Sequence, residues 1–181
     1  MKLARTAFLA LITVIGFSFI TADAQSFVST KKVRTMDEQI YRKLQGLPNS
    51  NVFDYIDWDI NGSTVTLTGK VYTLGTKRTA ANIVKDIPGV TNVINNIQEL
   101  SPSSMDDRIR REALRSFTNG GPAQYFGNPN PDVRIIVERG RLTLEGFVAR
   151  KSDSDLLNIL ANSIPGVFQV TNNLVVGERK F

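Results

Sequence analysis

The chain of 181 residues contains neither cysteine nor histidine. Without cysteine it can form no disulfide, no thiolate nucleophile and no lipid anchor on an amino-terminal cysteine. Without histidine as well, it cannot assemble His- or Cys-based zinc sites, Ser-His-Asp triads or Cys-His pairs. No recurring group of Asp, Glu, Lys, Ser, Tyr and Arg replaces them, so we expect no enzyme activity, no metal and no cofactor.

One pair of carboxylates remains as a candidate for chemistry. Asp57 and Asp59 flank Trp58, so they would share one face of a strand, where they could bind a hard cation or act as acid and base. Two acids at this spacing more often form the solvated face of a half-buried strand, and the sequence favours that interpretation.

Long apolar runs are also scarce, and the one at the amino terminus reads as a targeting segment. Lys2 and Arg5 precede an apolar run over 7–20, and small residues follow at 22–24. Residues 1–24 therefore resemble a secretory signal peptide. The run of about 14 residues is shorter than the roughly 17 to 25 that span a bilayer, so an uncleaved anchor is the less favoured alternative. We expect a soluble mature protein in an exported compartment.

The charge is mildly basic, with a formal net value of +5. Such a balance favours anionic surfaces without choosing between phospholipid, polysaccharide and nucleic acid, and export ranks phospholipid headgroups first. Lys31, Lys32 and Arg34 concentrate part of this charge in a polar linker over 25–35. This segment is an ordinary solvated linker or a basic arm that adds avidity for an anionic surface.

The rest of the chain is a tandem repeat. The segment 66–71, Thr-Leu-Thr-Gly-Lys-Val, returns at 143–148 as Thr-Leu-Glu-Gly-Phe-Val, and Ile-Pro-Gly-Val at 87–90 returns unchanged at 164–167. The spacing of 77 residues holds without a gap. Because turn residues and apolar alternation repeat while charges do not, the similarity describes a shared fold.

Each repeat predicts the same order of elements. A hydroxyl residue three positions before an acid, at Thr35 and again at Ser104, predicts the start of a first helix. Apolar alternation on both sides of Asn61-Gly62 and of Arg139-Gly140 predicts a β-hairpin. A second amphipathic helix then ends at a Pro-Gly pair, and a final strand follows. The predicted unit is helix, strand, strand, helix, strand.

With this order, the Leu-x-Gly strands, the Pro-Gly-Val turns and the Val-x-Asn-Asn endings, both halves resemble the BON domain. The resemblance covers 36–100 and 105–177. It implies an α/β fold, specifically an α+β sandwich in which each repeat has a three-stranded mixed sheet with two helices on one face. It also implies a non-enzymatic periplasmic protein that associates with phospholipid and supports the envelope under osmotic stress. Lipoprotein members carry a cysteine that this chain lacks, so any membrane contact would be peripheral.

The second repeat holds the candidate binding residues. Arg108, Arg111 and Arg115 recur on one side of its first helix, and Tyr125 and Phe126 lie in a loop rich in glycine and proline. The arginines could form a plain solvated face and the aromatics could fold back onto the core. The alternative hypothesis is that these five residues bind anionic phospholipid, with the aromatic rings at headgroup depth.

Two other function classes stay open. A small sheet with an exposed edge can recruit a partner strand, so the protein could instead be an interaction or chaperone-like module for an envelope protein. Nucleic-acid binding of the KH type would require a Gly-x-x-Gly loop, which is missing, and export makes it less favoured still. The joint at 101–103 is very short, which predicts a fixed arrangement of the two repeats.

Overall fold

The computed structural model describes residues 34–48, 50–127 and 130–177, and residues 33–181 form one compact unit. The expected signal peptide, together with Lys31 and Lys32 of the basic arm, lies outside the described residues. Arg34 is described and is exposed to solvent. The backbone carbonyl of Arg34 accepts a hydrogen bond from the Gln39 side chain at 3.1 Å, so the linker joins the first helix through its main chain.

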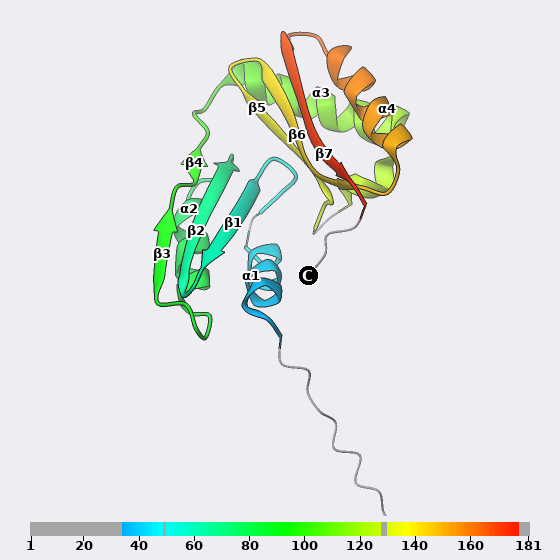
Figure 1. Cartoon of the computed structure of the whole chain (residues 1–181). Helices are drawn as coiled ribbons and strands as arrows, with labels where there is room; N and C mark the ends of the chain where they lie inside the picture. The colour runs from blue at the N-terminus through cyan, green and yellow to red at the C-terminus, as the bar shows by residue number, and fades with distance from the viewer. Residues whose placement is uncertain (1–33, 49, 128–129, 178–181) are drawn as a thin grey trace, which may run out of the picture. The chain divides into compact units, whose positions relative to one another are not determined.

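The predicted order of elements is confirmed in both repeats, and the chain is an α+β protein (Figure 1). Repeat one consists of α1 (Met36–Gln45), β1 (Tyr55–Asn61), β2 (Thr64–Val71), α2 (Thr76–Lys85), β3 (Asn92–Asn95) and β4 (Gln98–Glu99). Repeat two consists of α3 (Ser104–Gly120), the short 3-10 helix η1 (Ala123–Phe126), β5 (Val133–Glu138), β6 (Arg141–Val148), α4 (Lys151–Asn162) and β7 (Gln169–Val176).

Both sheets are mixed, as predicted. In repeat one β1 pairs antiparallel with β2, and β2 pairs parallel with β3 and β4. In repeat two β5 pairs antiparallel with β6, and β6 pairs parallel with β7. One expectation needs correction, because the final strand of repeat one is interrupted after Asn95 and continues as β4, whereas β7 runs unbroken for 8 residues.

The repeated asparagine of the Val-x-Asn-Asn endings ties the final strand to the second helix. In repeat one the Asn95 side chain donates to the Lys77 carbonyl at 2.8 Å and accepts from the Ile97 amide at 3.2 Å. In repeat two Asn172 donates to the Ser154 carbonyl at 3.2 Å and accepts from the Leu174 amide at 3.1 Å. A side chain that can both donate and accept is required at this position, which explains its recurrence.

The helix starts follow the predicted chemistry, with one shift in position. Thr35 caps α1 in a full capping box with Glu38. The cap of α3 is Ser103, whose hydroxyl accepts from the Asp106 amide at 3.2 Å, and Ser104 is already inside the helix. Either serine could cap the helix by its sequence position. The extended backbone of Ser103 makes it the cap, because a cap residue lies outside the helical conformation.

The hairpins depend on one close backbone approach that is common to both repeats. Gly69 and Gly146 adopt φ values of 116° and 117°, and a β-carbon there would lie 2.2 Å from the Tyr55 carbonyl oxygen or 2.0 Å from that of Asp132. Only glycine fits such a site. The repeat-one turn is Gly62-Ser63, one residue later than predicted, and the repeat-two turn is Arg139-Gly140 as predicted.

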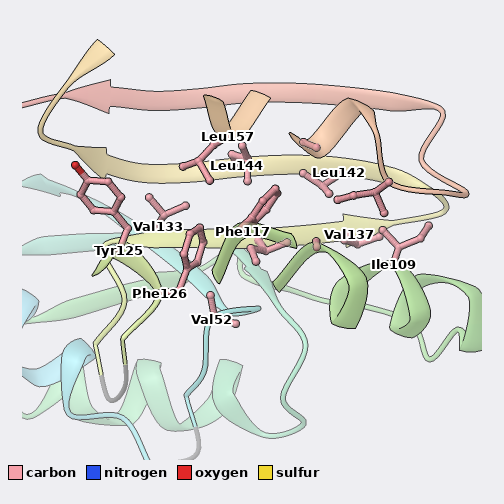
Figure 2. Packing of buried hydrophobic residues seen from close by; sticks show 14 of the residues in the cluster. Val52, Ile109, Phe117, Tyr125, Phe126, Val133, Val137, Leu142, Leu144 and Leu157 are labelled. Carbon is pink, nitrogen blue, oxygen red and sulfur yellow. The ribbon is translucent and has the colours of Figure 1, made fainter. Parts of the chain in front are cut away.

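Each sheet packs one face against both of its helices. The core of repeat two combines the inward positions of β5 and β6 with apolar residues of α3 and α4 (Figure 2). The repeat-one core is built in the same way from β2, α1 and α2. Residues buried to 1% exposure or less in repeat two include Ile109, Ala113, Phe117, Val133, Ile135, Val137, Leu142, Leu144, Val148, Leu157 and Ala161.

Repeat one contributes a residue to the core of repeat two. Val52, which precedes β1, is 6% exposed and packs in the repeat-two cluster (Figure 2). Its carbonyl accepts from the Ile135 amide at 2.8 Å, and the neighbouring Asn51 carbonyl accepts from the Arg134 guanidinium at 2.9 Å. Buried Asp54 orders this segment by accepting from the Tyr72 amide at 2.7 Å.

Candidate functional site

The three predicted arginines lie on the exposed side of α3. Arg108, Arg111 and Arg115 are all exposed, and the core residues Ile109 and Ala113 of the same helix are buried. Arg115 lies 3.7 Å from the Glu112 carboxylate, a distance typical of a loose surface pair. The structure therefore brings the three guanidinium groups to one solvent-facing side of the helix.

Arg110 differs from its neighbours and does not extend this face. It is only 1% exposed, and its guanidinium donates to the Asp107 carboxylate at 2.6 Å and to the Val137 carbonyl at 2.5 Å. The group also lies over the Tyr72 ring of repeat one, 4.5 Å from the ring centroid. These bonds hold Arg110 between the two repeats, although it is adjacent in sequence to the exposed Arg111.

Of the two alternatives for the loop aromatics, the structure shows that they fold back onto the core. Tyr125 and Phe126 are each 7% exposed, and their rings lie among the core residues of repeat two (Figure 2). The Phe126 ring stacks on Phe117 with centroids 5.5 Å apart. The loop has folded back, because η1 turns both rings inward, so they are not available to a bilayer.

The Tyr125 hydroxyl is at the centre of a small polar network. It donates to the Asp153 carboxylate at 2.7 Å and accepts from the Ala149 amide at 2.9 Å. The Tyr125 hydroxyl, followed by the Arg150 guanidinium, holds the pKa of the Asp153 carboxyl below its usual value. These bonds pin the loop to the start of α4, which is a structural role.

A different part of repeat two brings basic side chains together. Asp106, in the first turn of α3, is 3% exposed and accepts from the backbone amides of Arg139 at 2.9 Å and Gly140 at 2.8 Å. This contact attaches the β5–β6 turn to the start of α3. Arg139 has φ 52°, the one positive value for a residue other than glycine in the described chain. The turn thus presents Arg139 and Arg141 beside the first turn of α3.

Two large apolar side chains are exposed at the same end. Phe168, in the connection between α4 and β7, is 66% exposed, and Met105 of α3 is 54% exposed. The Phe168 amide donates to the Gly140 carbonyl at 3.2 Å, and the Arg141 guanidinium lies 5.6 Å from the Phe168 ring centroid. We call this surface, made of Met105, Arg139, Arg141 and Phe168, the basic-apolar tip.

Sequence reasoning missed the tip, although a signal for it was present. Phe168 follows the Pro-Gly-Val turn at the position where repeat one has Thr91, and Arg141 stands where repeat one has Thr64. A comparison of the repeats position by position shows an aromatic residue just before the final strand and an arginine at the start of the middle strand, where repeat one has two threonines. The adjacency itself came only with the register of β6 and β7, which pairs Arg141 with Gln169.

The acids near the tip and along α3 are already bonded. Asp106 holds the turn amides, Asp107 pairs with Arg110, and Glu138 pairs with Lys70 at 2.5 Å. The positive charge of the exposed arginines is therefore only partly offset at the surface. An arginine-rich surface with bonded acids attracts anions through its long-range field.

The carboxylate pair of β1 lies on a partly exposed strand. Asp57 is half-buried and Asp59 is exposed, and no group of three or more acids that could hold a metal exists among the described residues. Burial raises the pKa of Glu145, a hydrogen bond from Asn173 opposes that rise, and the charge of Asp57 adds to it. Asp57 and Asp59 thus match the solvated strand face that the sequence favours.

Within the described residues, no helix combines the length and the apolar character needed to cross a membrane. Residues 38–100 and 106–178 each match the family model described as BON domain. No match to a curated protein was found.

Among solved structures, the chain is similar to CdsD, a structural protein of the type III secretion system of Chlamydia trachomatis. One CdsD structure is 13% identical, covers 79% of this chain and 93% of that chain, and gives a TM-score of 0.30. A second, of the CdsD C-terminal domain, is also 13% identical, covers 81% of this chain and 100% of that chain, and gives a TM-score of 0.31.

Proposed function

This chain belongs to the BON-domain family and carries two copies of the domain in tandem, and from that premise we propose that it binds anionic phospholipid surfaces peripherally. BON domains are associated with phospholipid and envelope binding and are generally non-enzymatic. The proposal includes export of the protein to the periplasm, where it would support the envelope under stress. Its lipid-binding residues are Arg108, Arg111 and Arg115, without the buried Tyr125 and Phe126.

The observation that carries this proposal is the exposed arginine face of α3. Three guanidinium groups face solvent on one side of a helix of 17 residues. Each basic residue held near an anionic surface contributes roughly 1 kcal/mol, and the contribution falls off within a Debye length. Three together would give a binding contribution of roughly 3 kcal/mol at low salt. Such a contribution suits reversible attachment.

The test is co-sedimentation of the purified protein with vesicles of neutral or anionic lipid across a salt series. We expect binding to anionic vesicles only, weakened by salt, and weakened on the order of 100-fold at low salt when Arg108, Arg111 and Arg115 are all changed to Gln. The matched control changes three basic residues of α2, Lys77, Arg78 and Lys85, to Gln. Equal loss in both variants would make the effect one of net charge, and no binding by the unmodified protein would reject the proposal.

One observation favours a second candidate, a module that binds an envelope protein by strand addition. β7 is an edge strand of its sheet, its 8 residues carry no charge, and Val175 is 53% exposed. Uncharged, uninterrupted edges are suited to pairing with a partner strand. A Val175→Lys substitution would place a charge on this edge, and this candidate predicts the loss of salt-insensitive protein binding with vesicle binding not weakened.

A further inference from the structure

We propose that the basic-apolar tip of repeat two is the part of the protein that enters the bilayer, with Phe168 as the inserted side chain and Met105 beside it. This inference rests on the proposed function and adds a second contact to it. The arginine face of α3 supplies attraction at a distance, whereas the tip would supply contact below the headgroups. The occupant is an anionic lipid bilayer.

The first argument is the exposure of the two apolar side chains together. Phe168 and Met105 leave 66% and 54% of their surfaces in water. Gly140 makes room for the ring, because a β-carbon there would lie 2.8 Å from Phe168, and the Met105 methyl lies close to Gly166 at the same end. Apolar surface that is held out in water gains free energy when it enters a membrane interface.

The second argument is the position of the arginines around that apolar surface. The Arg141 guanidinium lies 5.6 Å from the centroid of the Phe168 ring. Long cationic side chains keep their charge at the phosphates while an adjacent aromatic ring occupies the headgroup boundary. Asp106 fixes the backbone of the turn that carries Arg139, next to the strand that carries Arg141. A surface with an apolar centre and a basic border matches an anionic bilayer.

The third argument is the matching end of repeat one, which is polar. Thr91 occupies the position of Phe168, and its hydroxyl lies 2.7 Å from the Ser63 hydroxyl. Thr64 occupies the position of Arg141. The same backbone therefore carries an uncharged polar pair in one repeat and an aromatic-arginine pair in the other. Insertion is expected from repeat two alone.

The absence of cysteine from the sequence provides a direct experiment. The full chain carrying Phe168→Cys or Thr91→Cys is labelled with an environment-sensitive fluorophore and mixed with vesicles of phosphatidylglycerol and phosphatidylcholine. We expect the probe at 168 to brighten and shift to the blue, and the probe at 91 to stay as in buffer. A probe at 168 that stays as in buffer on bound vesicles would overturn the inference.

Binding measurements on label-free variants complete the test. Phe168→Thr is expected to weaken binding to these vesicles about tenfold, from the loss of the apolar surface that Phe168 exposes. Leu74→Thr, which removes a side chain 78% exposed in repeat one, is the control and is expected to bind as the unmodified protein does. If Phe168→Thr binds as tightly as the unmodified protein, insertion of the tip is rejected and the proposed function stands. Failure of the unmodified protein to bind any vesicle rejects the proposed function and the tip with it.

Discussion

The two repeats use the same acid for different purposes. Asp37 and Asp106 occupy equivalent places in the first turns of α1 and α3. Asp37 accepts from the Trp58 indole at 2.7 Å, so it fixes a strand side chain. Asp106 accepts from two backbone amides of the β5–β6 turn and so fixes the turn itself. Both repeats thus have the same fold, but the first helix is bonded to a strand side chain in repeat one and to the hairpin turn in repeat two.

This comparison shows how one fold can carry a structural end and a binding end. In repeat one the strand and turn positions next to the first helix are occupied by Ser63 and Thr91, which bond to each other. In repeat two the corresponding positions are Gly140 and Phe168, and the ring is turned to solvent. The differences lie at positions that the fold does not constrain.

The largest effect is expected where the repeats are the same. Gly69→Ala and Gly146→Ala each force a methyl group against a carbonyl oxygen at a positive φ, so each should lower the free energy of unfolding by about 3 kcal/mol or more. Urea unfolding followed by circular dichroism measures both. A glycine that tolerates alanine in only one repeat would break the equivalence of the two hairpins.

A smaller, unequal effect is expected for the two acids. Asp106→Ala leaves two turn amides without their acceptor and should cost about 3 kcal/mol, whereas Asp37→Ala releases one indole and should cost about 1 kcal/mol. Urea unfolding of the two variants gives both values, with Trp58 fluorescence reporting on repeat one. Equal costs would contradict the different uses of the acid.

The loop that only repeat two possesses provides the next test. Tyr125→Phe removes the hydroxyl bonded to Asp153 and to the Ala149 amide and should cost about 1 to 2 kcal/mol of stability. Because the ring stays buried, vesicle binding at 25 °C should not change. If the variant instead binds vesicles more weakly and keeps normal thermal stability, Tyr125 would have to be exposed, which would contradict the structure.

The smallest effect concerns pH. The Tyr125 hydroxyl and Arg150 hold the pKa of Asp153 below its usual value, so this carboxylate stabilises the fold above its unfolded pKa, and the contribution is lost as the pH falls below about 4. Repeat one has Thr76 at the equivalent position. Thermal melts from pH 7 to pH 3 should therefore show a shallower decline for Asp153→Asn than for the unmodified protein. If the melting temperatures of the two proteins fall in parallel, Asp153 does not contribute to the acid sensitivity.

Much of the fold could be predicted because it depends on local patterns that occur twice. Alternation identified the hairpins, helical spacing identified the buried side of α3, and the Pro-Gly pairs ended the second helices. The break after Asn95 could not be predicted, since the same Asn-Asn pair continues unbroken in β7. Ile97 fills the repeat-one core at this point, and that packing depends on distant residues.

The candidate site was predicted only where exposure follows from helical position. Arg108, Arg111 and Arg115 face solvent as their spacing predicts. Arg110 lies at the border of the apolar side, and its partners Tyr72 and Val137 come from distant segments, so no local pattern could bury it. The same limit applies to Phe168, whose importance depends on the pairing of β6 with β7.

Val52 gives the duplicated chain a property that duplication alone does not. The sequence looks modular, with a joint at 101–103 where the halves could be separated, yet a side chain from the first half completes the interior of the second. A fragment that begins after this joint would fold around a missing piece and leave the Ile135 amide without its acceptor. The second copy therefore depends on the first for part of its interior, and we expect the isolated second copy to be less stable than the same repeat within the pair.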